Sequence, residues 1–126
     1  MSRVVHFEIG VDDPKRAIKF YQDVFGWKID QWEAPGAPPM DYWLITTGQA
    51  PDMGIDGALT PRSSYPQPVV NTISVDSVEK ALARIKSAGG QVLSGKAPIP
   101  TIGWFATCKD SEGNIFGILE PDKKAA

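Results

Sequence analysis

Two side chains near the start of the sequence, His6 and Glu8, are of types that transfer protons in proteins. They belong to the run VVHFEIGV, residues 4–11, whose alternation predicts a β-strand. Side chains two residues apart in a strand point to the same face. A neighbouring carboxylate raises the pKa of an imidazole, so one hypothesis is that the two residues form an acid–base pair. The alternative is that His6 only forms hydrogen bonds within the sheet.

This strand lies at the start of the first copy of an internal repeat of about sixty residues. At an offset of 64, residues 5–28 align with residues 69–92 without a gap. At an offset of 60, the segment GIDGALTP at residues 54–61 aligns with NIFGILEP at residues 114–121. The chain is therefore interpreted as a tandem duplication.

Each copy predicts one strand, one helix and three further strands. Asp13 followed by Pro14 predicts the start of the first helix and Gly26 its end, whereas Ser77 starts the second helix and Gly89 follows it. The strands after the helices are predicted at residues 27–32, 42–47 and 54–60, and at residues 91–94, 103–109 and 114–120. The expected fold class is α+β, with tandem βαβββ modules whose curved mixed sheets carry the helices on the outer face.

The length of 126 residues is typical of one domain. We expect a single domain over residues 1–126, with modules at about 1–60 and 69–121 and a Pro-rich linker at 61–68.

Strand alternation predicts which side chains lie on the sheet face away from the helix, here called the open face. Phe7, Ile9 and Val11 suit the helix side, which leaves His6 and Glu8 on the open face. The same parity predicts the open-face residues of the last strand of the first module and of the first and last strands of the second module. They are Ile55, Gly57, Leu59, Val70, Thr72, Ser74, Ile115, Gly117 and Leu119. Such a mixture of apolar and polar groups is typical of a small-molecule pocket.

Composition and charge exclude several classes of partner. The formal net charge of −2 gives no signal for binding nucleic acid. The N-terminal stretch reaches charged residues before any apolar run long enough for a signal peptide or membrane span, so we expect a cytoplasmic protein without a membrane partner. The single cysteine, Cys108, is expected to be a buried small hydrophobe.

The paired modules, with HFEIGVDDPKRAIKFYQDVFGW at the front and KDSEGNIFGILEP at the back, resemble the vicinal oxygen chelate superfamily. That superfamily contains glyoxalase I, extradiol dioxygenases, fosfomycin-resistance enzymes and bleomycin-resistance binding proteins. In its metal-dependent members, the first and last strands of each module each supply one ligand to a divalent ion. The resemblance also implies a homodimer.

Carried over to this sequence, the four ligand positions are His6, Gly57, Val70 and Gly117, and only the imidazole could bind a metal. Glu8 could add one oxygen, but a catalytic metal centre normally needs about three protein ligands. No metal site of the usual kind and no cofactor are predicted, while a relocated divalent-metal site stays open.

Three functions follow from these features. The first is binding of a small apolar or aromatic molecule, with Trp43 and Trp104 as pocket walls beside Val70, Thr72, Gly57 and Gly117. The second is an enzyme in which His6 and Glu8 are catalytic without the metal quartet. The third, implied by the resemblance, is a metal-dependent lyase of the glyoxalase I type, whose chemistry needs a metal to polarise the enediolate oxygens. Against the first, tryptophans in a small domain are often core or dimer-interface residues.

Overall fold

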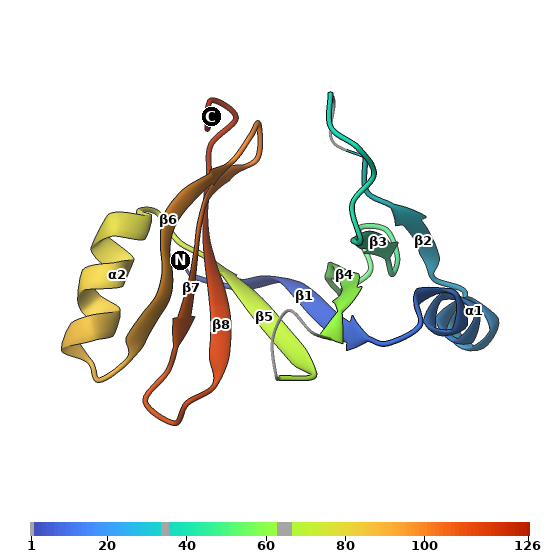
Figure 1. Cartoon of the computed structure of the whole chain (residues 1–126), viewed down its shortest axis with the longest axis horizontal. Helices are drawn as coiled ribbons and strands as arrows, with labels where there is room; N and C mark the ends of the chain where they lie inside the picture. The colour runs from blue at the N-terminus through green and yellow to red at the C-terminus, as the bar shows by residue number, and fades with distance from the viewer. Residues whose placement is uncertain (1, 34–35, 63–66) are drawn as a thin grey trace. The chain divides into compact units, whose positions relative to one another are not determined.

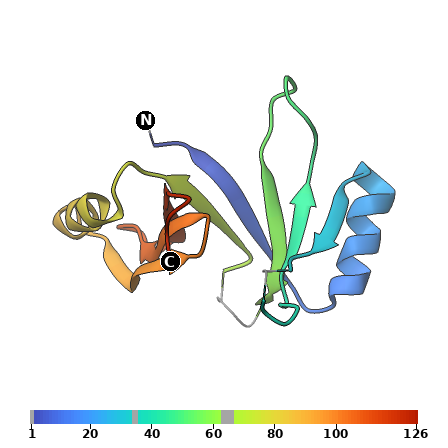
Figure 2. The same cartoon turned by 90° about the horizontal axis from the view of Figure 1, so that it is seen from above.

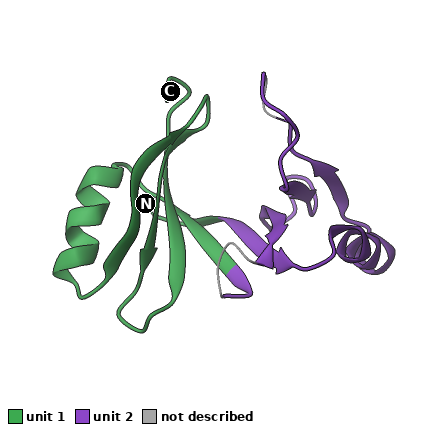
Figure 3. Ribbon diagram, viewed as in Figure 1, with its two compact units in different colours: residues 1–5, 70–126 green, residues 6–69 purple. Residues whose placement is uncertain are grey.

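The computed structural model describes residues 2–33, 36–62 and 67–126, and it divides into two compact units. One unit contains residues 6–69, and the other contains residues 1–5 and 70–126 (Figure 3). Each unit holds one helix and four strands, so the predicted α+β class and the βαβββ order of each module are confirmed. The middle of the predicted linker, residues 63–66, lies outside the described residues.

The unit of residues 6–69 is a four-stranded mixed sheet with α1 on one side (Figures 1 and 2). Its strands follow the order β2-β3-β4-β1, in which β1 and β4 are parallel and the other pairs are antiparallel. Its elements are β1 (Val4–Val11), α1 (Pro14–Phe25), β2 (Lys28–Gln31), β3 (Trp43–Thr46) and β4 (Asp56–Pro61).

The second unit repeats this topology with the order β5-β8-β7-β6, in which β5 and β8 are parallel. The Ser74 N–H donates to the Arg3 carbonyl at 2.8 Å and so holds the first residues of the chain to this unit. Its elements are β5 (Val69–Ser74), α2 (Val78–Ser87), β6 (Gln91–Ile99), β7 (Gly103–Lys109) and β8 (Ile115–Pro121).

One strand is longer than predicted. β6 was expected to end at residue 94 but continues to Ile99, and two register shifts interrupt its pairing with β7. The added part contains Gly95 and Pro98, which weaken a strand prediction. It is tolerated because β6 pairs with one neighbour and lies at the end of this unit's strand order, where a proline loses no ladder hydrogen bond.

The helix ends and the last turn form as predicted. The Asp13 carboxylate accepts from the Arg16 N–H at 3.2 Å, and Gly26 closes α1 in the left-handed conformation with φ 70°. The Ser77 hydroxyl accepts from the first turn of α2 in the same way. In the turn before β8, hydrogen bonds from the Asn114 backbone and side chain are the main cause of the lowered pKa of Asp110.

The core of the unit of residues 6–69 lies between α1 and the sheet. Buried Val11, Ile29, Ile45 and Leu59 form its centre. The partly buried side chains packed against them are Phe7, Ile9, Ala17, Ile18, Tyr21, Trp27 and Trp43. The predicted helix side of β1 is therefore confirmed.

The predicted faces of β4 are wrong. Leu59 lies in the core, and Gly57 also points toward the helix, because the parallel register pairs Phe7 with Gly57 and Ile9 with Leu59. Paired residues of neighbouring strands share a face, so the open-face residues of β4 are Asp56 and Ala58 instead.

The second unit keeps the predicted faces, since its register pairs Thr72 with Gly117. Glu8 corresponds to Thr72 in the repeat and pairs with Ala58. The open-face counterpart of Gly117 is therefore Ala58. The alignment of the two repeats instead matches Gly117 with the neighbouring residue, Gly57.

Gly57 is required by a close approach between β1 and β4. A Cβ atom built on Gly57 would lie 2.4 Å from the Phe7 carbonyl oxygen and 2.6 Å from the Phe7 ring. Because the backbone oxygen cannot move without breaking the strand pairing, even a methyl group at residue 57 would push the two strands apart.

We expect Gly57→Ala to lower the free energy of unfolding by about 1–3 kcal/mol, the usual cost of overpacking. Gly48→Ala is the matched control in the same unit, because nothing lies within 4 Å of its added Cβ and its φ is not in the left-handed region. Urea unfolding of both variants measures the difference. Equal midpoints for the two variants would contradict the close approach.

Candidate functional site

The open face of residues 6–69 carries the polar residues predicted on β1. His6 and Glu8 point away from α1, and their β4 partners are Asp56 and Ala58. On β3, Leu44 lies on the open face and pairs with Ala58. The structure thus places His6 and Glu8 on the predicted face and adds an aspartate beside the imidazole.

A tyrosine that the sequence analysis did not select joins the two predicted residues. The Tyr42 hydroxyl donates to Glu8 Oε2 at 2.5 Å and lies 2.8 Å from His6 Nε2. His6 Nε2 and Glu8 Oε2 are themselves 4.0 Å apart. The imidazole and the carboxylate are therefore brought together, but their link runs through the phenol rather than through a direct hydrogen bond.

Burial controls the proton state of this network. The pKa of His6 is lowered because burial disfavours the imidazolium, and the negative charges of Glu8 and Asp56 only partly oppose this effect. Burial, followed by the charge and the hydrogen bond of Glu8, raises the pKa of Tyr42. The effect of Glu8 on the His6 pKa thus has the predicted sign, but burial outweighs it, and both rings are neutral at pH 7.

Neither tryptophan chosen as a pocket wall lies on an open face. Trp43 packs against the core under α1, and Trp104 packs against the core under α2. Trp104 Nε1 donates to Asp122 at 3.2 Å, and the Lys96 ammonium lies 4.8 Å from the centre of the Trp104 ring. The alternative that these tryptophans are core residues is the one that the packing supports.

Trp32 is the tryptophan on the open face of residues 6–69. Its N–H donates to the Tyr42 carbonyl at 2.8 Å, which extends the pairing of β2 and β3 beyond Gln31 and Trp43. The Trp32 and Tyr42 rings lie edge to face, with centroids 6.0 Å apart. The run Tyr42–Ile45 gives no alternation that would have identified the face of Tyr42, which is set by the pairing of β3 with β4.

In the second unit, an aromatic ring fills the space beside Gly117. A Cβ atom on Gly117 would lie 2.5 Å from Phe105 Cζ and 3.2 Å from Thr72 Oγ1. Val70 and Thr72, on the same face, are 6% and 4% exposed. The structure thus brings Val70, Thr72 and Gly117 to the predicted face, whereas Gly57 lies on the helix side of its own unit. The predicted ligand-binding roles of these residues stay predictions.

The residues at the expected ligand positions do not fit a four-ligand metal ion. Val70 and Gly117 carry no donor atom, and the open-face position of β4 holds Ala58 in place of Gly57. Within residues 2–33, 36–62 and 67–126, no group of three or more His, Cys, Asp or Glu side chains is placed to hold a metal ion. Of the usual donor set, only the His6 imidazole is present.

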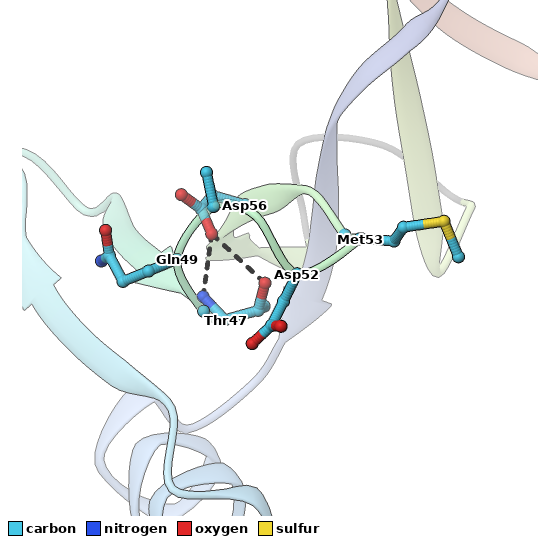
Figure 4. Close-up of a pocket in the computed structure, with 8 residues that line it drawn as sticks. Thr47, Gln49, Asp52, Met53 and Asp56 are labelled. Atoms are coloured by element: carbon cyan, nitrogen blue, oxygen red, sulfur yellow. Dashed lines mark hydrogen bonds between the residues drawn. The ribbon is translucent and has the colours of Figure 1, made fainter.

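A pocket of about 410 Å³ lies in the loop between β3 and β4 (Figure 4). Asp56 holds this loop, since its Oδ1 accepts from the Thr47 N–H at 2.9 Å and from the Thr47 hydroxyl at 3.2 Å. The pocket is lined by Thr47, Gly48, Gln49, Ala50, Asp52, Met53, Gly54 and Asp56. Because Asp56 also pairs with His6, the pocket adjoins the open face.

The two helices are short, and no helix in the described ranges is long and apolar enough to cross a membrane.

Known proteins are similar to this chain in sequence or in fold. "Putative glyoxylase CFP32" of Mycobacterium bovis is 32% identical over 119 residues, which are 90% of this chain but 42% of that protein's length. The "Glyoxylase-like domain-containing protein" of Didymella fabae is 30% identical and covers 93% of this chain and 92% of its own. Methylmalonyl-CoA epimerase from Mycobacterium tuberculosis has the same fold, with a TM-score of 0.68, 18% identity and coverage of 94% of this chain and 87% of its own.

A model of a protein family matches residues 3–118, which are nearly the whole chain. The chain belongs to the Glyoxalase/Bleomycin resistance protein/Dioxygenase superfamily.

Proposed function

We propose that this protein binds a small molecule with an apolar or aromatic body on the open face of residues 6–69, without the four-ligand metal site. The observation that carries the proposal is the Tyr42 hydroxyl, which contacts both His6 Nε2 and Glu8 Oε2. One imidazole nitrogen and one carboxylate oxygen that could ligate a metal are thereby engaged with the protein itself.

The surroundings of this network suit such a ligand. Trp32 and Leu44 offer apolar surface on the same face, and Leu44 is 41% exposed. The adjoining loop pocket of about 410 Å³ is within the size range of small-molecule sites, and its mainly polar lining suits the polar end of such a ligand.

A homodimer is part of the proposal. Phe20, Val24 and Phe25 on α1 are 54%, 56% and 60% exposed, which is apolar surface that a second copy could cover.

A metal-dependent lyase is the second candidate, because the sequence relatives named above carry glyoxylase names. Its chemistry would need ligands in place of the donor-free positions at Ala58, Val70 and Gly117. At Gly117 the Phe105 ring occupies the space that a ligating side chain would take.

A screen of aromatic fragments, followed by tryptophan fluorescence, tests the binding proposal. We expect Trp32→Ala to weaken the binding of a hit about 2- to 10-fold, because an aromatic contact contributes about 0.5–1.5 kcal/mol beyond its buried area. Trp104→Phe is the control, since Trp104 lies in the core of the other unit. A hit that is weakened by Trp104→Phe but not by Trp32→Ala would contradict the proposed location.

Metal analysis separates the two candidates. Protein purified without chelator and dialysed against Zn²⁺ or Ni²⁺ is expected to retain less than one equivalent of metal. It is also expected to leave the glutathione hemithioacetal of methylglyoxal unchanged. A full equivalent that is lost on His6→Ala, together with hemithioacetal turnover, would establish the lyase instead.

The lowered pKa of His6 predicts a pH dependence of stability. Above the unfolded value of about 6.5, the imidazole is neutral in both states and contributes no pH dependence. As the pH falls below 6.5, the unfolded chain takes up the proton first, so the wild type loses stability relative to His6→Gln. The loss cannot exceed about 1.4 kcal/mol per pH unit, the slope for one proton.

Urea unfolding of both proteins between pH 5 and 8 measures the difference, which also cancels the titration of the common carboxylates. A wild type that gains stability relative to His6→Gln on acidification would show that the folded pKa is raised.

A further inference from the structure

We propose that Tyr42 is a positioning residue that holds His6 in the Nε2–H tautomer, so that Nδ1 accepts a hydrogen bond from an N–H or O–H group of the ligand. This inference rests on the proposed function, because it specifies the polar group of the molecule bound at the same site.

The donors and acceptors of the network fix the tautomer. A phenol has one hydrogen to donate, and an ionised carboxylate can only accept. The shorter contact, 2.5 Å, joins the Tyr42 hydroxyl to Glu8, so the phenolic hydrogen lies there. The contact of 2.8 Å between the Tyr42 oxygen and His6 Nε2 then needs a hydrogen from the imidazole.

This arrangement leaves the other ring nitrogen as the acceptor. A neutral imidazole carries one N–H, and burial of His6 favours the neutral ring. Across residues 2–33, 36–62 and 67–126, no hydrogen-bond partner is found for Nδ1. Asp56, the other charged group near the ring, has Oδ1 engaged with Thr47.

The topology makes this contact depend on Tyr42. In the sheet, β4 lies between β3 and β1, so the phenol of Tyr42, the residue directly before β3, must reach over β4 to meet β1. The β4 residue between Leu44 and Glu8 is Ala58, whose methyl group leaves room for that crossing. The His6 and Tyr42 rings lie nearly parallel, at an interplanar angle of 18° with centroids 6.5 Å apart.

The ligand class follows from both sides of the site. Trp32 and Leu44 suit an apolar or aromatic body, and Nδ1 requires a hydrogen-bond donor on it. A phenol, an aromatic amine or an amide N–H has this combination, whereas a compound with acceptors alone does not.

Imidazole NMR tests the inference directly because His6 is the only histidine in the sequence. Long-range ¹H–¹⁵N correlation at pH 7.5 on the unmodified ¹⁵N-labelled protein is expected to show a protonated Nε2 and an unprotonated Nδ1. In Tyr42→Phe we expect a mixture of tautomers. Tyr21→Phe is the control, since Tyr21 stacks on Trp27 in the helix-side cluster and keeps its ring in the variant.

A protonated Nδ1 in the unmodified protein would overturn the inference, and this measurement requires no variant to fold. An unchanged tautomer in Tyr42→Phe would also overturn the role of Tyr42.

A fragment found in the fluorescence screen provides the second readout. A bound phenol is expected to shift the Nδ1 resonance, and Tyr42→Phe is expected to weaken its binding about tenfold. Binding without a shift of Nδ1 would overturn the predicted hydrogen bond. If no fragment binds, the proposed function fails, while the tautomer still decides the role of Tyr42.

Discussion

The parallel pairing of the first and last strands of each module determines what each open face displays. In residues 6–69, the register that pairs Phe7 with Gly57 turns one set of side chains under α1 and the other set outward. A slip of one residue in β4 would move Leu59 out of the core and Ala58 into it. Because Phe7 packs directly over Gly57, only glycine satisfies this register.

Two glycines that align in the sequence therefore have different physical roles. Gly57 permits the contact between two neighbouring strands on the helix side. Gly117 lies on the open face of its own unit, and its missing side chain is replaced by the Phe105 ring from β7. Gly57 and Gly117 match in the alignment of the two repeats, but the strand registers place Gly57 on the helix side and Gly117 on the open face.

The elements of the fold could be predicted from local sequence because their signals are local. Asp13, Pro14 and Gly26 mark a helix through their own backbone preferences, and the alternation in β1 separates its two faces. The faces of β3 could not be predicted in this way. Tyr42, Trp43, Leu44 and Ile45 are all apolar or aromatic, so they give no alternation, and the parity is set by pairing with β4.

Half of the candidate site could be predicted for the same reason. His6 and Glu8 lie on one strand, where spacing alone places them together. Tyr42, which links them, is 34 positions from Glu8 and 36 positions from His6 in the sequence. The link therefore depends on the order of the strands in the sheet. No local pattern encodes that β4 separates β3 from β1, or that Ala58 is small enough to be crossed.

The Tyr42 bridge also explains why histidine and glutamate can share a half-buried face without forming an ion pair. A direct contact would favour the imidazolium, which burial disfavours. With the phenol between them, the carboxylate receives its hydrogen from a group that stays neutral, and the imidazole donates to an oxygen that carries no full charge. The network contains one charged group instead of the two charged groups of an ion pair, and that lowers the cost of desolvating it. A half-buried site of this kind can therefore keep a neutral histidine at pH 7, which is the form that can accept a hydrogen bond.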